Sequence, residues 1–307
     1  MNYTPKQFNA AMGCLIGQAC GDALGTTLEF KSADRCRDLY PLGLRDIVGG
    51  GAFNVVPGQV TDDTEMAMAL ARSLTAEGVY HRRKVRNSYK AWANSKPIDM
   101  GGATSQALLQ NSPNPETEAN GALMRVSPLG VFLYDAPSSL LAFSLGAADA
   151  TLTHPSKVCQ NASGVFVATI AHAVANPHLI PEQLFTFAHD LAIDVRAESA
   201  ADDLEWAANR NLYPTASGHV RVAFRLAFYH LLHTKSFEES LVDTVMRGGD
   251  ADTNGAIVGA LMGASHGANA IPLRWEQTIR EASVTRPKEY QVTDLAQVTA
   301  DLMTSGR

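Results

Sequence analysis

Four glycines near the start of the chain, spaced four residues apart, limit the possible folds more than any other feature of the sequence. The stretch GCLIGQACGDALG places on one face of an expected helix Gly13, Gly17, Gly21 and Gly25. A glycine inside a helix costs about 1 kcal/mol relative to alanine. Four at one spacing indicate that another backbone, most simply a second helix, approaches this face closely. We predict tight helix packing at the first two glycines. From the third onward the segment also carries carboxylates, so either packing or function can explain it.

Apolar residues recur at helical spacing through most of the remaining chain. One helix is expected from Met66 to Leu74 and is ended by Gly78. Further helices are expected at 138–150, 158–175, 182–193, 217–233, 237–246 and 256–266. Ser236 and Glu239 fit a capping box at the start of one of them.

Strand signals are nearly absent from the sequence. The one short extended piece is expected within 49–58, where glycine and proline limit its length. No linker, low-complexity tract or solenoid-length repeat interrupts the chain. The sequence therefore predicts an all-α fold, with residues 1–307 forming a single domain of many helices.

The overall charge argues against a nucleic-acid partner. The chain is 46% hydrophobic and 18% charged, as expected for a globular protein with a large core, and its net charge is −6. The one basic cluster, HRRKVR at 81–86, is interpreted as a solvated helix face. Proteins that bind nucleic acids normally show a basic excess, which is missing here.

The cysteines and the N-terminal residues favour a cytoplasmic protein. The four cysteines, Cys14, Cys20, Cys36 and Cys159, show neither C-x-x-C pairing nor zinc-like spacing. Free thiols in apolar helical stretches suit a reducing compartment. The first ten residues carry no apolar signal core, and no run is expected to approach the roughly 18 apolar residues of a membrane span.

Adjacent carboxylates stand at the start of an apolar helix in QVTDDTEMAMAL, residues 59–70. The simplest explanation is helix capping, because acidic side chains suit a helix N-terminus and Asp62 with Glu65 fits a reciprocal arrangement. The alternative is that Thr61, Asp62 and Asp63 bind a ligand.

A second stretch, RGGDADTNGAIVGALMGASHG at 247–267, repeats this chemical pattern with Asp250, Asp252 and Thr253. Here too Asp252 or Thr253 may be assigned as an N-cap. However, Asp and Thr oxygens are hard ligands suited to Mg²⁺ or Mn²⁺. With Glu29 as a fifth carboxylate, two divalent ions roughly 3.5–4 Å apart would offset the crowded negative charge. Metal binding is favoured if the two stretches meet in space.

Several motifs in a fixed order resemble the ADP-ribosylglycohydrolase family. They are GDALGTTLEF, PGQVTDDTEMAMAL, NGALMRVSPLG and GGDADTNGAIVGALMGA, which together extend over most of the chain. The resemblance implies a compact all-α bundle with a binuclear Mg²⁺ or Mn²⁺ centre at the base of a cleft. One departure is Ala251, where the family often has threonine, and that position needs no metal contact.

The resemblance also implies a role for each matching metal-site residue. Thr61, Asp62 and Asp63 would bind one ion, Asp250 and Thr253 the other, and Asp252 both. Glu29 would lie close to the second ion and the attacking water.

The implied substrate contacts come from three further segments. Asn120, Gly121 and Met124 match the loop that cradles ADP-ribose, and His154 matches a histidine near the ligand. PIDMGGATSQAL, at 97–108, resembles the Asp-x-Gly element of the arginine-directed branch, so that Asp99 would face the substrate guanidinium beside Gly101 and Gly102. Helix capping is the alternative explanation for Asp99.

The implied reaction is hydrolysis of the bond between ribose C1 and an arginine nitrogen, with an oxocarbenium-like transition state. Metal ions would orient a water and lower its pKa, while Glu29, Asp62, Asp63, Asp99 and Asp252 are the candidate catalytic carboxylates. The expected partners are ADP-ribose and an ADP-ribosylated protein, and the expected state is a monomer.

Three alternatives remain open at this point. GASHG at 263–267 fits the G-x-S-x-G pattern of serine hydrolases, which requires a preceding strand. The second alternative is a binding or structural protein that keeps the fold without catalysis. The third is hydrolysis of ADP-ribose linked to serine or to an acyl group.

Overall fold

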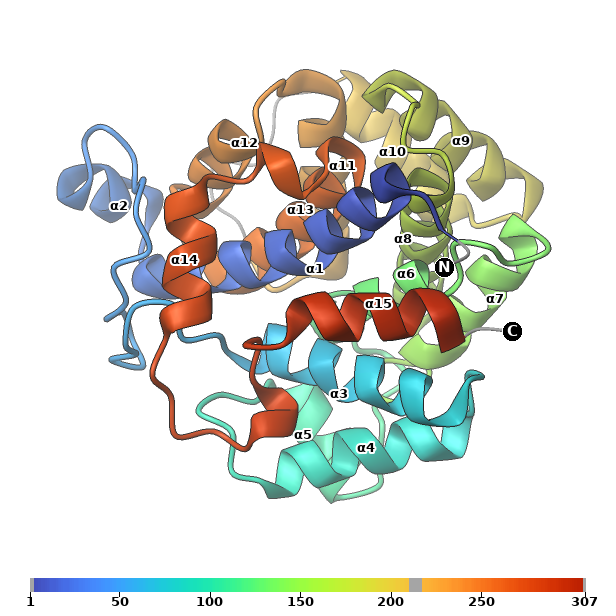
Figure 1. Cartoon of the computed structure of the whole chain (residues 1–307), viewed down its shortest axis with the longest axis horizontal. Coiled ribbons are helices and arrows are strands. Elements are labelled where there is room, and N and C mark those ends of the chain that lie inside the picture. The colour runs from blue at the N-terminus through green and yellow to red at the C-terminus, as the bar shows by residue number, and fades with distance from the viewer. Residues whose placement is uncertain (1–2, 210–216, 306–307) are drawn as a thin grey trace.

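Helices account for all regular secondary structure in the described residues, 3–209 and 217–305, of this computed structural model (Figure 1). Within that part of the chain there are only isolated bridges, and one of them, between Gly50 and Val55, is the short extended piece expected at 49–58. The prediction of an all-α fold is confirmed.

The helices follow one another along the chain. Their bounds are α1 Pro5–Gly25, α2 Ala33–Leu39, α3 Asp62–Glu77, α4 Arg82–Asn94, α5 Gly102–Leu109, α6 Ser127–Phe132, α7 Ser139–Ala150, α8 Lys157–Ala175, α9 Pro181–Asp194, α10 Glu198–Asn209, α11 Val220–His233, α12 Phe237–Val245, α13 Ala251–His266, α14 Leu273–Glu281 and α15 Leu295–Ser305. Four 3₁₀ turns complete them: η1 Thr26–Leu28, η2 Asn120–Ala122, η3 Ala268–Ala270 and η4 Lys288–Tyr290.

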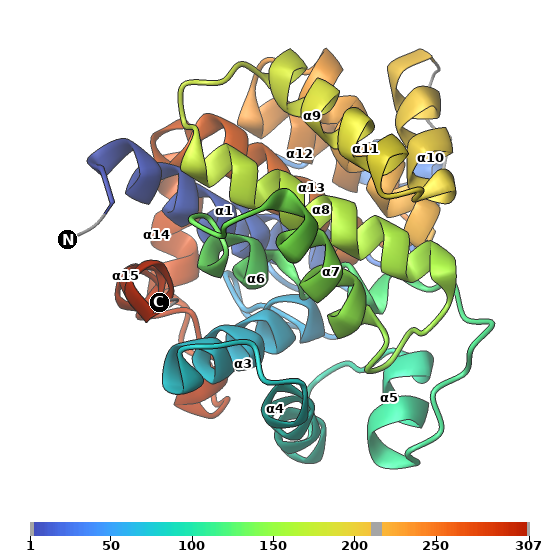
Figure 2. The ribbon, with the colours of Figure 1, turned by 90° about the vertical axis from the view of Figure 1, so that its right-hand side faces the viewer.

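The centre of the protein is the antiparallel pair α1 and α13, which lie side by side in both ribbon views (Figures 1 and 2). A Cβ atom added to Gly17 would lie 2.2 Å from the carbonyl oxygen of Gly259, and one added to Gly21 would lie 2.0 Å from that of Gly255. Gly13 and Gly25 approach α13 equally closely. The predicted helix packing is therefore confirmed, and it extends to all four glycines.

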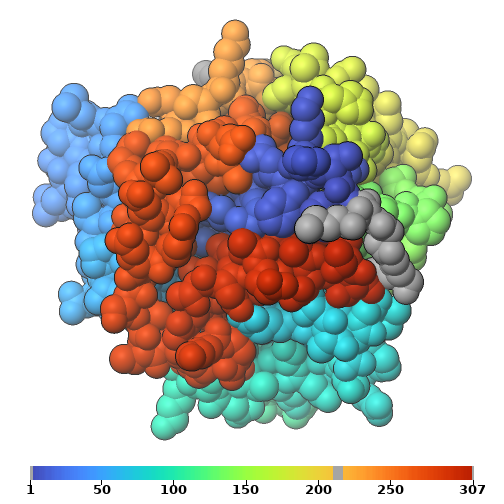
Figure 3. All heavy atoms as spheres, in the orientation of Figure 1, coloured from blue at the N-terminus to red at the C-terminus, as the bar shows by residue number. Residues whose placement is uncertain are grey.

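The other helices surround this pair. Helices α3 and α4 lie below it in Figure 1, while α7 and α8 pack together on another side. The C-terminal segment lies across one face, where α14 crosses one end of α1 and α15 lies between α1 and α3 (Figures 1 and 3). The predicted end of α3 is also confirmed, because Gly78 takes the left-handed conformation with φ 68°.

Two expectations need correction. Ser236 caps α12, but no reciprocal bond from Glu239 is found among the described residues, because its carboxylate instead accepts hydrogen bonds from Arg45. Helix α8 is long and apolar enough to cross a membrane, contrary to the expectation that no segment approaches this limit. Most of its apolar window is buried inside the protein, which also explains the composition of a core helix.

The close contact between α1 and α13 can be tested by adding one methyl group. Gly17→Ala should lower the free energy of unfolding by about 1–3 kcal/mol, because overpacking outweighs the better helix propensity of alanine. The measurement is urea unfolding followed by circular dichroism. Gly102→Ala is the control for stability, since its Cβ would meet no atom within 4 Å. Equal stability of the two variants would contradict the close contact.

Candidate metal centre and substrate cleft

The acidic N-terminus of α3 is not capped by its own side chains. Helix α3 begins at Asp62, and the N-cap residue Thr61 makes no side-chain capping bond. The Glu65 carboxylate accepts hydrogen bonds from Trp92 Nε1 at 2.8 Å and from Arg286 at 2.7 and 2.8 Å. Reciprocal capping between Asp62 and Glu65 is therefore wrong, because a tertiary contact holds Glu65.

A carboxylate from α1 caps α3 instead. Asp22 is fully buried and accepts hydrogen bonds from the Thr61 N–H at 3.0 Å, from the Thr64 N–H at 3.2 Å and from the Thr61 hydroxyl at 3.0 Å. Sequence reasoning assigned Asp22 no role. The available signal was an aspartate inside an apolar helix, since a buried carboxylate requires nearby donors.

The N-terminus of α13 is capped in the same way. Asp250 is its N-cap residue and makes no side-chain capping bond, so the alternative assignments of Asp252 and Thr253 as N-cap are wrong. Glu29, which follows η1, accepts hydrogen bonds through Oε2 from the backbone N–H groups of Ala251 at 2.6 Å and Asp252 at 3.4 Å.

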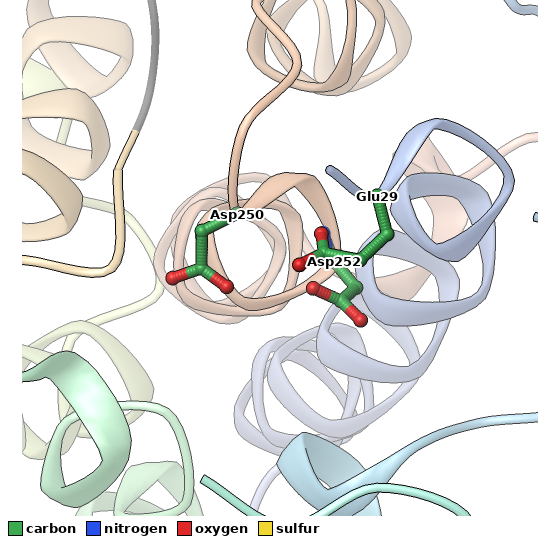
Figure 4. Close-up of side chains that lie close together, drawn as sticks. All are labelled: Glu29, Asp250 and Asp252. Carbon is green, nitrogen blue, oxygen red and sulfur yellow. The ribbon is translucent and has the colours of Figure 1, made fainter. Parts of the chain in front are cut away.

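The two acidic helix termini meet in space. Oxygen atoms of Glu29, Asp250 and Asp252 lie within 4.8 Å of one another. Figure 4 shows the Glu29 and Asp252 carboxylates close together at the start of α13. Asp62 and Asp63 of α3 both lie near enough to Asp250 for its charge to raise their pKa values. The sequence favoured metal binding on the condition that the two acidic stretches meet in space, and this condition is met.

Burial and mutual repulsion disfavour the charged forms of these groups. The pKa values of Asp62, Asp63 and Asp252 are raised well above their usual range, first by desolvation and then by neighbouring carboxylates. Desolvation also raises the pKa of Glu29 to about 7. Within the described part of the chain, no Arg, Lys or His forms an ion pair with these carboxylates.

The donor set fits hard divalent cations. The residues offer only carboxylate and hydroxyl oxygens, which are the ligands that Mg²⁺ and Mn²⁺ prefer. Asp63 Oδ1 is buried and has no hydrogen-bond partner in the part of the chain that the structure describes. A bound cation would satisfy this oxygen and offset the repulsion between the carboxylates.

A cleft of about 600 Å³ opens above the acidic cluster. The predicted site residues that line it are Glu29, Asp62, Asp99, Gly101, Gly102, Asn120, Gly121, Met124, His154, Asp250 and Thr253. The other three, Thr61, Asp63 and Asp252, are buried and do not line it. All fourteen predicted residues thus lie in the wall of one cleft or in the acidic cluster beside it.

Asp99 lies half-buried in the cleft wall, just before α5. The N-cap residue of α5 is Gly101, and within the described residues the Asp99 side chain accepts a bond only from its neighbour, the Met100 N–H at 2.8 Å, so capping by Asp99 is wrong. The Gly101 N–H also donates to Asp62 Oδ2 at 3.4 Å. This contact joins the α5 start to the acidic cluster.

The segment at 120–124 forms the opposite wall with His154. Asn120 Nδ2 donates to Asp250 Oδ2 at 2.5 Å. A Cβ on Gly121 would lie 2.9 Å from the His154 ring, so only glycine fits there without displacing the histidine. Burial lowers the pKa of His154 to about 3, which keeps its ring neutral.

A buried ion pair that sequence reasoning missed supports this wall. The fully buried Arg125 pairs with Asp149 at 3.2 Å and donates to the Gly121 carbonyl at 3.0 Å and to the Thr153 hydroxyl at 2.7 Å. Thr153 Oγ1 lies 2.8 Å from His154 Nδ1. Arg125 therefore fixes the backbone at 121 and, through Thr153, the histidine ring.

Phe30 is a cleft residue that sequence reasoning missed. Its side chain is 70% exposed and lines the cleft directly after Glu29. The backbone has φ 61°, uncommon for a large residue, and the Phe30 N–H donates to the Gly249 carbonyl at 2.8 Å. Nothing in the sequence signals this conformation, because it depends on a contact with the start of α13.

Comparison with known proteins agrees with this geometry. The profile of the family described as ADP-ribosylglycohydrolase matches residues 3–306. The chain belongs to this family. Its members are glycohydrolases, so the reaction class predicted from the motifs is confirmed at the level of the family.

The relatives of this family member include two named enzymes. ADP-ribosyl-[dinitrogen reductase] glycohydrolase of Rhodospirillum rubrum is 30% identical over 88% of this chain and 90% of the relative. ADP-ribosylarginine hydrolase Tri1 of Serratia proteamaculans is 29% identical over 88% of this chain and 75% of the relative. A solved structure, "ADP-ribosylglycohydrolase-related protein complex", superposes with a TM-score of 0.78 at 25% identity and covers 99% of this chain and 100% of its own.

The electrostatic cost of the cluster predicts how stability depends on pH without metal. The folded pKa of Glu29 is about 7 against an ordinary 4.5, so the folded state binds more protons than the unfolded state between these values. The contribution of such groups to stability is present below the unfolded pKa and is lost as pH rises through the folded pKa.

The pKa of Asp63 is raised in the same way, so Asp63→Asn should raise the unfolding temperature in EDTA by at least about 2 °C at pH 8 and by less at pH 5. Thermal unfolding at both pH values measures this, with the exposed Asp38→Asn as control. Saturating Mn²⁺ should stabilise the unsubstituted protein more than Asp63→Asn. A variant less stable than the unsubstituted protein at pH 8 in EDTA would contradict the repulsion.

Proposed function

We propose that the protein is a metal-dependent hydrolase that removes ADP-ribose from modified arginine side chains. The observation that carries this proposal is the meeting of two acidic helix termini beside one cleft, with Asp99 in its wall. The named activity of the Serratia relative supports the arginine linkage.

The residues that would hold two Mg²⁺ or Mn²⁺ ions come from both helix termini. Thr61, Asp62 and Asp63 would hold one ion, Asp250 and Thr253 would hold the other, and Asp252 would contribute to both. When bound, such ions position the ribose hydroxyls and a water and lower the pKa of that water.

Carboxylates on the cleft surface perform the proton transfers. Glu29 and Asp62 both line the cleft and are available to take the proton of the attacking water at ribose C1. Asp99 lines the wall near Asp62 and Asp250, and its carboxylate can pair with the leaving guanidinium by charge-assisted hydrogen bonds. Its pairing orients the arginine and supports departure of the guanidine nitrogen.

The opposite wall orients ADP-ribose. Asn120 is held by Asp250, and Gly121 leaves room for the His154 ring. Because His154 is neutral and Thr153 already holds its Nδ1, its Nε2 is the ring atom left for the substrate. Met124 adds apolar surface to the same wall.

The serine-hydrolase alternative does not fit the fold. Ser265 and His266 are the last two residues of α13, so helix rather than strand precedes the G-x-S-x-G pattern. A nucleophile elbow needs a strand before the serine. That alternative is therefore wrong.

We also propose a cytoplasmic location. The four cysteines are all free and buried, and Cys14 and Cys20 lie in a helix as the sequence predicted. This arrangement suits a reducing compartment.

One panel of assays tests the proposed activity. ADP-ribosylarginine, ADP-ribosylserine and O-acyl-ADP-ribose are each incubated with Mg²⁺, Mn²⁺ or EDTA, and released ADP-ribose is measured. We expect release from the arginine substrate with a metal and none in EDTA. Binding without release would identify a binding protein, and preferential release from another substrate would reassign the linkage.

Asp62→Ala and Asp252→Ala should each lower turnover of ADP-ribosylarginine by at least about 100-fold, since each removes a ligand of the proposed two-ion centre. Circular dichroism should show the same helix content in both. Asp38→Ala, on the exposed surface, is the control and should retain full turnover. Activity retained in both site variants would contradict a binuclear centre.

Asp99→Asn should lower turnover of ADP-ribosylarginine by about 100-fold, because the amide cannot pair with a guanidinium as a carboxylate does. O-acyl-ADP-ribose has no guanidinium, so any hydrolysis of it should fall much less. Steady-state kinetics on both substrates measure the difference. An equal loss on both would show that Asp99 does not act on the leaving group.

A further inference from the structure

Helix α1 carries a second functional face besides its glycines. Gln18 and Asp22 lie four residues apart, so they share one side of the helix, and both are almost completely buried. Neither belongs to the set of predicted metal ligands. Both direct their polar atoms at backbone groups of the segments that form the proposed site.

Asp22 determines the conformation of the α3 start. Thr61 is in an extended conformation, with φ −110° and ψ −161°, and its side chain does not cap the helix. The Asp22 carboxylate accepts the N–H groups of Thr61 and Thr64, which would otherwise be buried donors without partners. Asp62 and Asp63 lie between these two anchor points, so their backbone position depends on Asp22.

Gln18 connects this helix start to the opposite wall of the cleft. Its side-chain amide donates to the carbonyl of Asp63 at 3.1 Å and to the carbonyl of Met124 at 3.0 Å. Ser127 in turn donates to Gln18 Oε1, which fixes the orientation of the amide. One side chain thus sets the spacing between a metal-site segment and the proposed ADP-ribose loop.

The chemical type of Asp22 also calls for an explanation. Serine, threonine or asparagine would cap a helix terminus without adding charge. Asp22 instead adds a further negative charge beside Asp62 and Asp63. Such a residue is costly in the cluster alone and favourable when cations are held there, because it increases the local negative potential.

We propose that Asp22 and Gln18 are positioning residues, which preorganise the α3 start for divalent cations and couple it to the substrate loop. The proposal rests on the metal dependence in the proposed function. It assigns to α1 the outer support of the centre, without direct contact with substrate.

Direct binding of Mn²⁺ tests this, measured by calorimetry or by electron paramagnetic resonance of free Mn²⁺. Asp22→Asn should weaken Mn²⁺ binding by about 10–100-fold, as for other outer-shell partners of metal ligands. The Mn²⁺ concentration for half-maximal turnover should rise to match, while saturating Mn²⁺ restores most of the turnover.

Glu65→Gln is the matched control. Like Asp22, Glu65 is a buried carboxylate near the start of α3. It pairs with Arg286 and lies outside the acidic cluster. This variant should lose stability but bind Mn²⁺ within about twofold of the unsubstituted protein. If Asp22 had only a structural role, Asp22→Asn and Glu65→Gln would both lose stability and both keep their affinity for Mn²⁺.

Gln18→Met keeps the test decisive if Asp22→Asn does not fold. It removes both donors at similar side-chain length and should weaken Mn²⁺ binding while raising the KM for ADP-ribosylarginine.

Unchanged Mn²⁺ affinity in the folded variants overturns the positioning role and leaves the proposed function intact. If the unsubstituted protein binds Mn²⁺ without hydrolysing any substrate, the activity is wrong and the positioning role stands. If it binds no Mn²⁺, the metal dependence and the positioning role both fall.

Discussion

The contact between the glycine faces of α1 and α13 is the constraint on which the rest of the structure depends. The two helices run antiparallel, so the end of α1 at Gly25 meets the start of α13 at Ala251. This brings Glu29 to the N-terminal backbone of α13 and places Asp252 beside it. Any side chain larger than hydrogen along this face would separate the helices and move Glu29 away from its donors.

The same helix also governs the second acidic terminus, through Asp22. Both helix starts are therefore capped by carboxylates of α1 and of the turn that follows it, so Asp62, Asp63 and Asp250 do not cap their own helices. Such a centre is expensive in the absence of cations, because burial and repulsion oppose every charge in it. Functional sites commonly accept this kind of local cost, which the packing of the surrounding helices must offset.

The sequence predicted the helical class, the glycine contact and both acidic helix starts, because each depends on local spacing and residue type. It misjudged which residues cap the helices, since local patterns favoured Asp62 with Glu65, and Asp252 or Thr253. The real caps, Asp22 and Glu29, act across tens to hundreds of positions, and no local pattern reports such pairings. Arg125 and Phe30 escaped notice for the same reason, as their roles come from tertiary contacts.

The arrangement of the acidic cluster and the cleft wall bears on which ADP-ribose linkage this family member selects. The acidic cluster would act on the ribose and the water, which every ADP-ribose linkage presents alike. Discrimination between leaving groups must then come from residues outside the cluster that face the cleft, and Asp99 and Phe30 are the two that stand out. Asp99 supplies negative charge and Phe30 an exposed aromatic face, and a guanidinium can pair with the first and stack on the second. A neutral acyl group would gain from neither, so the proposed preference for arginine rests on these residues more than on the cluster.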